Sequence, residues 1–261
     1  MPKTQMVFIM KKQFLALTAL LFSSVSQAYW QPHGQMSWQI QFAGSFNPNV
    51  NAQVFDVDLF DTPQSTIDLL HSQGKKVICY FSAGSSEKWR SDFWRFPASV
   101  KGRNLSGWAG EKWLDIRRLD ILMPIMRDRI ALAKQKNCDA VDPDNVDGYT
   151  NRTGFKLRYN DQLTYNRALA TEAHAQGLAI GLKNNLNQIP DLLNDFDFAI
   201  NESCMVYNEC SLVAPFIAAN KPVFHIEYQA DITALCSLGN SYGFSSIKKN
   251  QNLDEWRDSC L

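Results

Sequence analysis

The chain has 261 residues, 26 basic and 26 acidic side chains, and a formal net charge of zero. This balance argues against nucleic-acid binding, which requires a strongly basic surface. Hydrophobic residues make up 45% of the chain and charged residues 20%, so the sequence can fill a large core and is not of the disordered type. The length suits one large domain.

The first 28 residues have the features of a secretory signal peptide. Lys11 and Lys12 form a basic region before an apolar run over residues 14–25, and a small-residue cleavage site follows at Ser26-Gln27-Ala28. The alternative, a membrane anchor, is disfavoured because a bilayer-spanning helix needs roughly 20 apolar residues. We therefore predict a signal peptide over residues 1–28 and a secreted or periplasmic protein without a membrane span after cleavage.

All six cysteines follow the predicted cleavage site. An even number in an exported chain favours disulfides, although six cysteines permit 15 pairings. Zinc binding is disfavoured because no C-x-x-C occurs and the four histidines are scattered. We expect no metal and no cofactor. Short sequence separation favours the pairs Cys204–Cys210 and Cys236–Cys260, which leaves Cys79 to pair with Cys138.

Eight short apolar runs alternate with longer helical segments after residue 28. This alternation predicts a parallel sheet with helical crossovers. Eight units fit a single (β/α)8 TIM barrel over residues 29–261 better than an open doubly wound sheet, and no G-x-G-x-x-G supports a dinucleotide-binding form. The expected strands are residues 38–42, 54–59, 76–82, 140–145, 179–183, 198–202, 223–228 and 244–247. The expected helices are residues 63–73, 120–136, 161–176 and 211–220.

One connection, residues 85–118, is long and shows no clear strand. It contains Trp89, Trp94, Trp108 and Trp113, four of the seven tryptophans. Long connections in compact domains are usually functional. We expect each tryptophan by itself to pack this segment onto the barrel, and at least one of the four to line a sugar-binding groove.

Acidic residues lie at the ends of four predicted strands. Active sites of parallel barrels lie at the carboxyl ends of the strands, and an unpaired charge is costly to bury. Because alternate side chains face the same side of a strand, Asp144 and Glu202 are the last inward-facing acids of the fourth and sixth strands. Glycoside hydrolysis needs such a pair, one of them with a pKa raised by its neighbours.

Other interpretations of these acids remain open. Residues 142–148 resemble a calcium-binding loop, but the pattern lacks the glutamate at its twelfth position. Some acids could cap the helices that follow them. A third possibility is that Asp58 or Glu227 only forms an ion pair with Lys183.

Six sequence blocks occur in order along the chain: WQIQ (38–41), VDLFD (57–61), CYFSAGS (79–85), WLDIR (113–117), DPDNVDGY (142–149) and GLKN (181–184). Together they resemble glycoside hydrolase family 114, the endo-α-1,4-polygalactosaminidases. The resemblance implies a (β/α)8 barrel that acts on α-1,4-linked galactosamine polymers. It also implies a catalytic aspartate on the fourth strand and a glutamate on the sixth, which are Asp144 and Glu202 here, with Asp142 as the rival on the fourth strand.

The predicted function is a secreted, endo-acting glycoside hydrolase that cleaves an α-1,4-linked galactosamine-containing polysaccharide. Asp144 is the expected nucleophile and Glu202 the acid/base of a retaining reaction. The alternative is a non-catalytic carbohydrate-binding barrel of an exopolysaccharide or envelope system. The expected partner is a cationic amino-sugar polymer bound by a monomer. The expected substrate contacts are Asp58, Tyr80, Asp142, Asn145, Lys183, Asn184 and Glu227.

Overall fold

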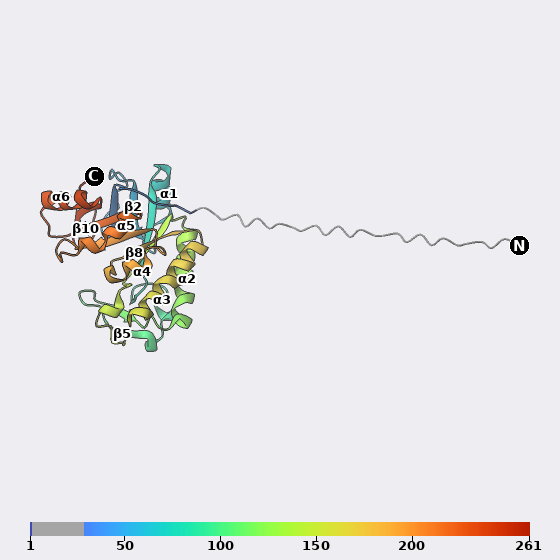
Figure 1. Ribbon diagram of the computed structural model, residues 1–261. Coiled ribbons are helices and arrows are strands. Elements are labelled where there is room, and N and C mark those ends of the chain that lie inside the picture. Colours follow the sequence, from blue (N-terminus) through green and yellow to red (C-terminus); the bar gives the residue numbers. More distant parts are fainter. Residues whose placement is uncertain (2–28) are drawn as a thin grey trace.

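The computed structural model describes Met1 and residues 29–261. The predicted signal peptide therefore falls almost wholly outside the described residues. Within residues 29–261, a large sheet is surrounded by helices, and a small sheet that includes β5 lies at the end of the molecule away from α6 (Figure 1).

The large sheet forms a nearly closed barrel. Its first eight strands are parallel and follow one another around the barrel in chain order, and one antiparallel strand ends the sheet. This order, with a helix in every connection between parallel strands except that from β1 to β2, is that of a (β/α)8 barrel, and the predicted fold class is confirmed. The nine strands of the large sheet are β1 (Trp38–Gln41), β2 (Val54–Asp58), β3 (Lys76–Ser82), β7 (Ala140–Asp144), β8 (Ala179–Lys183), β9 (Phe198–Glu202), β10 (Val223–Glu227), β11 (Ser245–Lys249) and β12 (Arg257–Ser259).

Side-chain alternation divides most of the barrel strands between two cores. Trp38, Ile78 and Phe224 belong to the cluster inside the barrel. Their neighbours in sequence, such as Val77 and Val223, pack with the helices outside it. Apolar residues therefore fill both faces of the strands, which is typical of parallel sheets, and a polar side chain at a strand end stands out.

The C-terminal segment completes the barrel between its first and last parallel strands. The backbone N–H of Phe42, which follows β1, donates to the carbonyl of Leu253 at 2.9 Å, and Trp38 Nε1 donates to the Ser245 carbonyl at 2.8 Å. The guanidinium of Arg257 on β12 donates to the Trp38 carbonyl. These contacts satisfy polar groups that an open sheet edge would expose.

Four helices were predicted, and all four are present. The last one is shorter than expected because Cys210–Leu212 forms a 3-10 turn and the α-helix starts only at Ala214, with Pro215 in its first turn. No helix of the described part of the chain is long and apolar enough to cross a membrane. The α-helices are α1 (Gln64–Ser72), α2 (Leu119–Gln135), α3 (Tyr159–Ala175), α4 (Ile189–Leu192), α5 (Ala214–Ala218) and α6 (Ile232–Tyr242).

The prediction that residues 85–118 contain no strand is wrong. This segment, called the insertion below, contains β4 (Ser85–Glu87), β5 (Lys101–Asn104) and β6 (Glu111–Leu114), which form an antiparallel sheet in the order β4-β6-β5. Their sequences, SSE, KGRN and EKWL, lack the apolar runs by which the barrel strands were found. Two-sided burial marks a parallel barrel strand, but a short antiparallel strand does not need it.

The three expected disulfides are all present. The Cys79–Cys138 bond joins β3 to the segment between α2 and β7. The Cys204–Cys210 bond closes a short loop after β9, and Cys236–Cys260 attaches the C-terminus to α6. The second of these bonds restrains a loop at the carboxyl end of the barrel, where the candidate site lies.

Candidate active site

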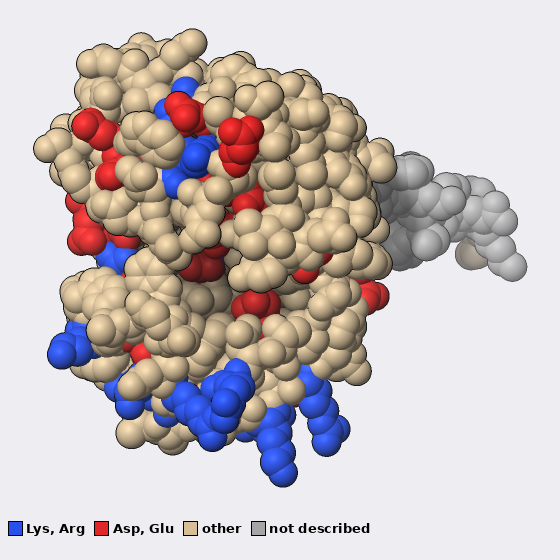
Figure 2. Space-filling view, turned by 90° about the vertical axis from the view of Figure 1, so that its left-hand side faces the viewer, with Lys and Arg blue, Asp and Glu red and all other residues tan. Residues whose placement is uncertain are grey.

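A cavity of about 620 Å³ opens at the carboxyl ends of the barrel strands. It is called the main cavity below. Its wall combines strand ends, the insertion and the segment before β12. Figure 2 shows one face of the molecule hollowed at its centre, with acidic side chains inside the hollow and basic side chains along the lower edge of the molecule. Of the nine residues predicted for the site, seven line the main cavity: Asp58, Tyr80, Asp144, Asn145, Lys183, Asn184 and Glu202.

Asp144 ends β7 and is held by two donors. The Tyr80 hydroxyl donates to its Oδ2 at 3.1 Å, and the backbone N–H of Asn145 donates to its Oδ1 at 2.7 Å. Asn145 has a positive φ of 61°, so the chain turns sharply after Asp144. Gly84 permits this turn, because a Cβ there would meet the Asn145 carbonyl oxygen at 1.7 Å. The glycine of the CYFSAGS block is thus explained by close backbone packing.

Glu202 ends β9 and has a matching set of donors. Asn184 Nδ2 donates to its Oε2 at 3.2 Å, and the Tyr228 hydroxyl donates to its Oε1. Asn184 Oδ1 also accepts the Glu202 backbone N–H at 2.9 Å. Each of the two acids therefore has one tyrosine hydroxyl and one amide donor, which fixes the direction of its carboxylate.

Lys183 lies between the two acids. Its Nζ is 3.8 Å from Asp144 Oδ1, 3.5 Å from Glu202 Oε2 and 3.9 Å from Asp142 Oδ2. Burial by itself would lower the pKa of Lys183, but the surrounding carboxylates outweigh burial and raise that pKa well above its ordinary value. Burial likewise acts to raise the pKa of Glu202, yet the Lys183 ammonium and the Tyr228 hydroxyl lower it overall. The lysine thus favours the ionised form of Glu202.

A second pair of acids lies beneath the cavity floor. Asp56 and Asp142 are both 0% exposed, and no N–H or O–H group of the described residues donates to either carboxyl. Burial raises the pKa of both, and the charge of Asp142 adds to the shift at Asp56. Two adjacent buried carboxyls are satisfied when they share a proton. Asp142 therefore supports Lys183 from below and does not line the main cavity.

Arg90 holds the insertion against the barrel. Its guanidinium forms a bidentate pair with Asp58, with distances of 2.5 and 2.9 Å, and also contacts Asp61 at 3.1 Å and Glu87 at 2.9 Å. The Asp58 carboxylate accepts two backbone N–H groups as well. Asp58 lines the main cavity, but its oxygens already have partners within the protein.

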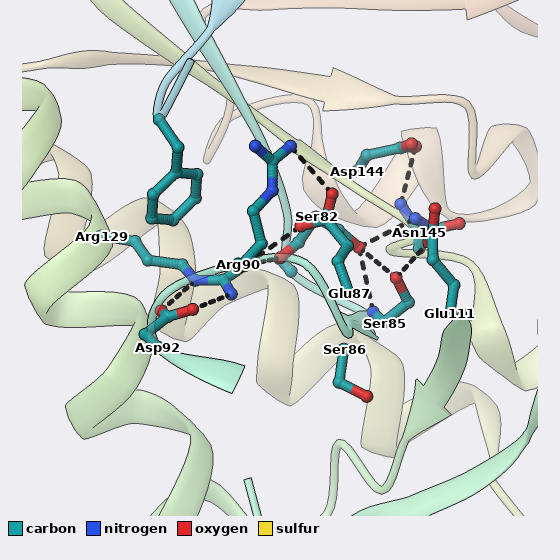
Figure 3. Close-up of polar contacts among 12 residues, drawn as sticks. Ser82, Ser85, Ser86, Glu87, Arg90, Asp92, Glu111, Arg129, Asp144 and Asn145 are labelled. Atoms are coloured by element: carbon teal, nitrogen blue, oxygen red, sulfur yellow. Dashed lines mark hydrogen bonds and ion pairs between the residues drawn. The ribbon is translucent and has the colours of Figure 1, made fainter. Parts of the chain in front are cut away.

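A chain of hydrogen bonds connects the insertion to the turn after Asp144 (Figure 3). Ser85 Oγ donates to Glu111 Oε2 at 2.6 Å and lies 2.7 Å from Ser82 Oγ. Asn145 Nδ2 donates to the same Ser82 oxygen at 2.9 Å. Each group in this chain donates to the next in the order Asn145, Ser82, Ser85, Glu111. An acceptor at Glu111 therefore fixes the orientation of the Asn145 amide.

Aromatic side chains of the insertion form one wall of the main cavity. Trp89 and Trp108 line it and are about half exposed, whereas Trp113 lines it from a buried position. The expectation that the cluster includes groove-lining residues is confirmed for these three. Trp94 is 80% exposed and is not part of the wall.

Glu227 does not lie at the cavity, contrary to the prediction. Strand alternation places Ile226 and Tyr228 toward the barrel interior and turns Glu227 to the helix side. There the Glu227 carboxylate is 0% exposed, accepts the Met205 backbone N–H at 2.7 Å and contacts His225 at 3.0 Å. Tyr228, the next residue, is the one that reaches the site, and the sequence-based selection of acids missed it.

The proposed ion pair of Lys183 with Asp58 or Glu227 is not present either. Lys183 pairs with the acids of β7 and β9, while Arg90 pairs with Asp58. The calcium-loop alternative is not supported, since the ammonium of Lys183 already lies against Asp142 and Asp144.

Among the described residues, one group has the spacing of metal ligands, namely Cys204, Cys210 and His225. The two sulfurs are joined in a disulfide. They cannot act as thiolate ligands, and the group does not fit a metal.

The barrel and its acid-lined cavity define the class of protein, a glycoside hydrolase of the TIM-barrel type. Residues 20–261 match the sequence model of glycoside-hydrolase family GH114, and the chain belongs to this family. The crystal structure of Aspergillus fumigatus Ega3 in complex with galactosamine is 42% identical to the chain, with a TM-score of 0.85, and the match covers 89% of this chain and 98% of that one.

Two more distant structures share the fold. The glycoside hydrolase domain of PelA from Pseudomonas aeruginosa is 14% identical with a TM-score of 0.68, over 85% of this chain and 98% of that one. A D-allulose 3-epimerase from Methylomonas sp. is 10% identical with a TM-score of 0.52, over 85% of each chain. No match was found among curated proteins.

Proposed function

We propose that this chain is a secreted or periplasmic enzyme that cleaves α-1,4-linked galactosamine-containing polysaccharide at internal bonds, with Asp144 and Glu202 as its catalytic pair. One observation carries the proposal: the two carboxylates lie on either side of Lys183 at the edge of an open cavity. Family membership and the galactosamine bound to the related Ega3 support the substrate class. Three disulfides support an oxidising location.

The geometry fits a glycosidase pair. Because Asp144 Oδ1 and Glu202 Oε2 lie 3.8 and 3.5 Å from the same nitrogen, these two oxygens are no more than about 7 Å apart. This range includes the separation of about 5–5.5 Å typical of retaining enzymes and the lower end of that for inverting ones. We propose retention, with the enzyme acting as a monomer, since one chain supplies the complete cavity wall.

The roles of the two acids can be assigned by experiment. The sequence-based hypothesis makes Asp144 the nucleophile and Glu202 the acid/base. The lowered pKa of Glu202 favours the reverse assignment, because a nucleophile must be ionised and a general acid protonated. Azide distinguishes them: in a retaining enzyme it rescues the acid/base variant with retained product configuration and the nucleophile variant with inverted configuration.

The first test is release of reducing ends from partly de-N-acetylated α-1,4-galactosamine polymer. We expect kcat to fall by about 10³-fold or more in Asp144→Asn and in Glu202→Gln, since both substitutions keep the side-chain shape and remove the acid. Thermal unfolding of both variants provides the control for folding. Equal turnover in wild type and variants would exclude this pair.

The competing function is a carbohydrate-binding barrel without catalysis. The aromatic wall of Trp89 and Trp108 is compatible with it. Polymer binding by the wild type without any release of reducing ends, and unchanged binding by Asp144→Asn, would favour that function.

A further inference from the structure

Two residues of the main cavity wall, Glu111 and Asn145, come from different sheets and are connected by two serines. Glu111 begins β6 in the insertion, and Asn145 follows β7 of the barrel. The distances along the chain Glu111, Ser85, Ser82, Asn145 are 2.6, 2.7 and 2.9 Å (Figure 3). Both serines are 0% exposed, so solvent does not compete for their hydrogen bonds. The insertion therefore has a buried connection to the turn that follows Asp144.

The side-chain amide of Asn145 has one atom engaged by the protein and one atom free. Its Nδ2 donates to Ser82 Oγ, whereas its Oδ1 accepts no hydrogen bond from the described residues and is not fully buried. Because Asn145 is a half-buried residue of the cavity wall, this accessible oxygen borders the main cavity. A molecule in the cavity therefore meets a carbonyl acceptor at this position.

The chain of hydrogen bonds has a second arrangement in which every donor again has an acceptor. When Glu111 is ionised, each hydroxyl donates toward its carboxylate, and Asn145 must supply Nδ2. When Glu111 is protonated, its carboxyl O–H can donate to Ser85 Oγ, and both serine hydroxyls rotate to donate in the opposite direction. The amide of Asn145 must then turn over to accept through Oδ1, which leaves Nδ2 toward the cavity. Each serine keeps its own proton, and Glu111 takes up one proton from the cavity that it lines.

We propose that Glu111 is a positioning residue whose ionisation decides, through the two serines, which atom of the Asn145 amide faces the substrate. Ionised Glu111 presents the carbonyl, which binds a hydrogen-bond donor of the sugar. Protonated Glu111 presents the amino group, which binds an acceptor. This inference rests on the proposed function, because it assigns Asn145 to substrate binding in the main cavity.

The groups that surround Glu111 place this change within an accessible pH range. Burial raises the pKa of Glu111 to about 7. The charges of Glu87 and Asp144 add to the shift, while the serine hydrogen bond and Arg90 oppose it. Tyr80 also faces Glu111, but burial raises the pKa of its hydroxyl well above the ordinary value, so it stays neutral. The amide should therefore present its amino group below about pH 7 and its carbonyl above it.

Nuclear magnetic resonance of protein with isotope-labelled asparagine tests the change without substrate. In the wild type we expect the side-chain amide resonances of Asn145 to shift with a midpoint near pH 7. Asn145→Gly assigns these resonances by their absence, and glycine tolerates the positive φ of 61° at this position. The transition should be lost in Glu111→Gln and also in Ser85→Ala, which breaks the chain but keeps the Glu111 carboxylate. A transition of wild-type size in Ser85→Ala, or none in the wild type, would overturn the inference.

A double-mutant cycle on the release of reducing ends tests whether the orientation of the amide matters to the substrate. At pH 8 we expect Glu111→Gln to lower kcat/KM by about 3- to 10-fold, mainly through KM, because glutamine permits both orientations of the amide. In the Asn145→Gly background the same substitution should have no further effect. Ser85→Ala should reproduce the loss. At pH 5, where Glu111 is protonated, Glu111→Gln should match the wild type. Asp68→Asn, which removes an exposed acid of α1, is the control for the loss of a negative charge and should match the wild type at both pH values.

The two experiments separate this inference from the proposed function. If the wild type releases no reducing ends, hydrolysis is excluded, while the Asn145 resonances still decide the inference. Equal losses from Glu111→Gln with and without Asn145→Gly would overturn the inference, because Glu111 would then act through its charge alone. Thermal unfolding of each variant shows whether it is folded.

Discussion

The carboxyl ends of the barrel strands and the insertion both line the main cavity, but their charged side chains have different partners. At the strand ends, Asp144 and Glu202 share one lysine and keep part of their surface open to the cavity. In the insertion, Arg90 is surrounded by Asp58, Asp61 and Glu87. The barrel thus presents charge to a ligand, whereas the charge of Arg90 holds the insertion to the barrel.

The contrast shows that the number of acids around a cavity does not indicate how many of them bind substrate. Asp58 was selected from the sequence as a substrate contact, and it does reach the cavity. Its carboxylate is nevertheless occupied by Arg90 and two backbone N–H groups. The partner of each acid decides its role, and partners from a distant segment cannot be identified from the strand pattern alone.

Removing the positive charge of Arg90 in the insertion should have the largest effect on stability. Arg90→Met leaves Asp58 and Glu87 buried without their common partner, which typically costs about 3–5 kcal/mol. We expect urea unfolding to show a loss of that size in the free energy of unfolding. The control is Arg118→Gln, which breaks the solvent-exposed pair with Asp120 and should cause no measurable change. Equal stability of the two variants would mean that Arg90 does not hold the insertion.

Removing the positive charge of Lys183 at the strand ends should affect catalysis instead. In Lys183→Met we expect kcat to fall by about 100-fold or more, because a preorganised charge beside the reacting groups is lost. Since Lys183 lowers the pKa of Glu202, its removal should also move the acid limb of the pH–rate profile to higher pH, with Glu202 acting as the ionised nucleophile.

Lys112→Met, on an exposed face of β6, is the matched control for this lysine. Its pH profile should coincide with that of the wild type. A Lys183→Met variant that retained the wild-type acid limb would show that the lysine does not set the ionisation of the pair, and the contrast with Arg90 would then disappear.

Sequence patterns were sufficient for the barrel because its strands are buried on both faces. Every predicted barrel strand is present, with ends that differ by at most two residues. Alternation within a strand also placed Asp144 and Glu202 correctly at the cavity. The same rule, had it been applied to β10, would have selected Tyr228 over Glu227, since Ile226 faces the interior.

The insertion and the strand-end turns could not be predicted in the same way. The strands of the insertion are short and polar, and the Arg90–Asp58 ion pair joins the insertion to a distant segment of the chain. The left-handed turns at Asn145 and Asn185 aim side chains that no periodicity locates. Asparagine tolerates this conformation better than most residues, so the DPDN and LKNN sequences carry the signal that could have indicated these turns.

The prediction with the smallest expected effect concerns Glu111, the one acid of the insertion that forms no ion pair. Burial raises the pKa of Glu111 to about 7; Glu87 and Asp144 add to the shift, while the Ser85 hydroxyl and Arg90 oppose it. The folded protein therefore holds this proton more tightly than the unfolded chain does. The stability that Glu111 contributes is complete below its ordinary pKa and is lost as the pH rises toward about 7.

Glu111→Gln removes this titration and keeps an acceptor for Ser85. Between pH 5 and pH 8 we expect the wild type to lose about 1–2 kcal/mol of stability relative to the variant, less than the full pKa shift implies because the side chain borders an open cavity. Urea unfolding at several pH values measures the difference. Parallel stability curves for wild type and Glu111→Gln would indicate that Glu111 is ionised throughout this range, and that the insertion balances all of its buried charges as it does those around Arg90.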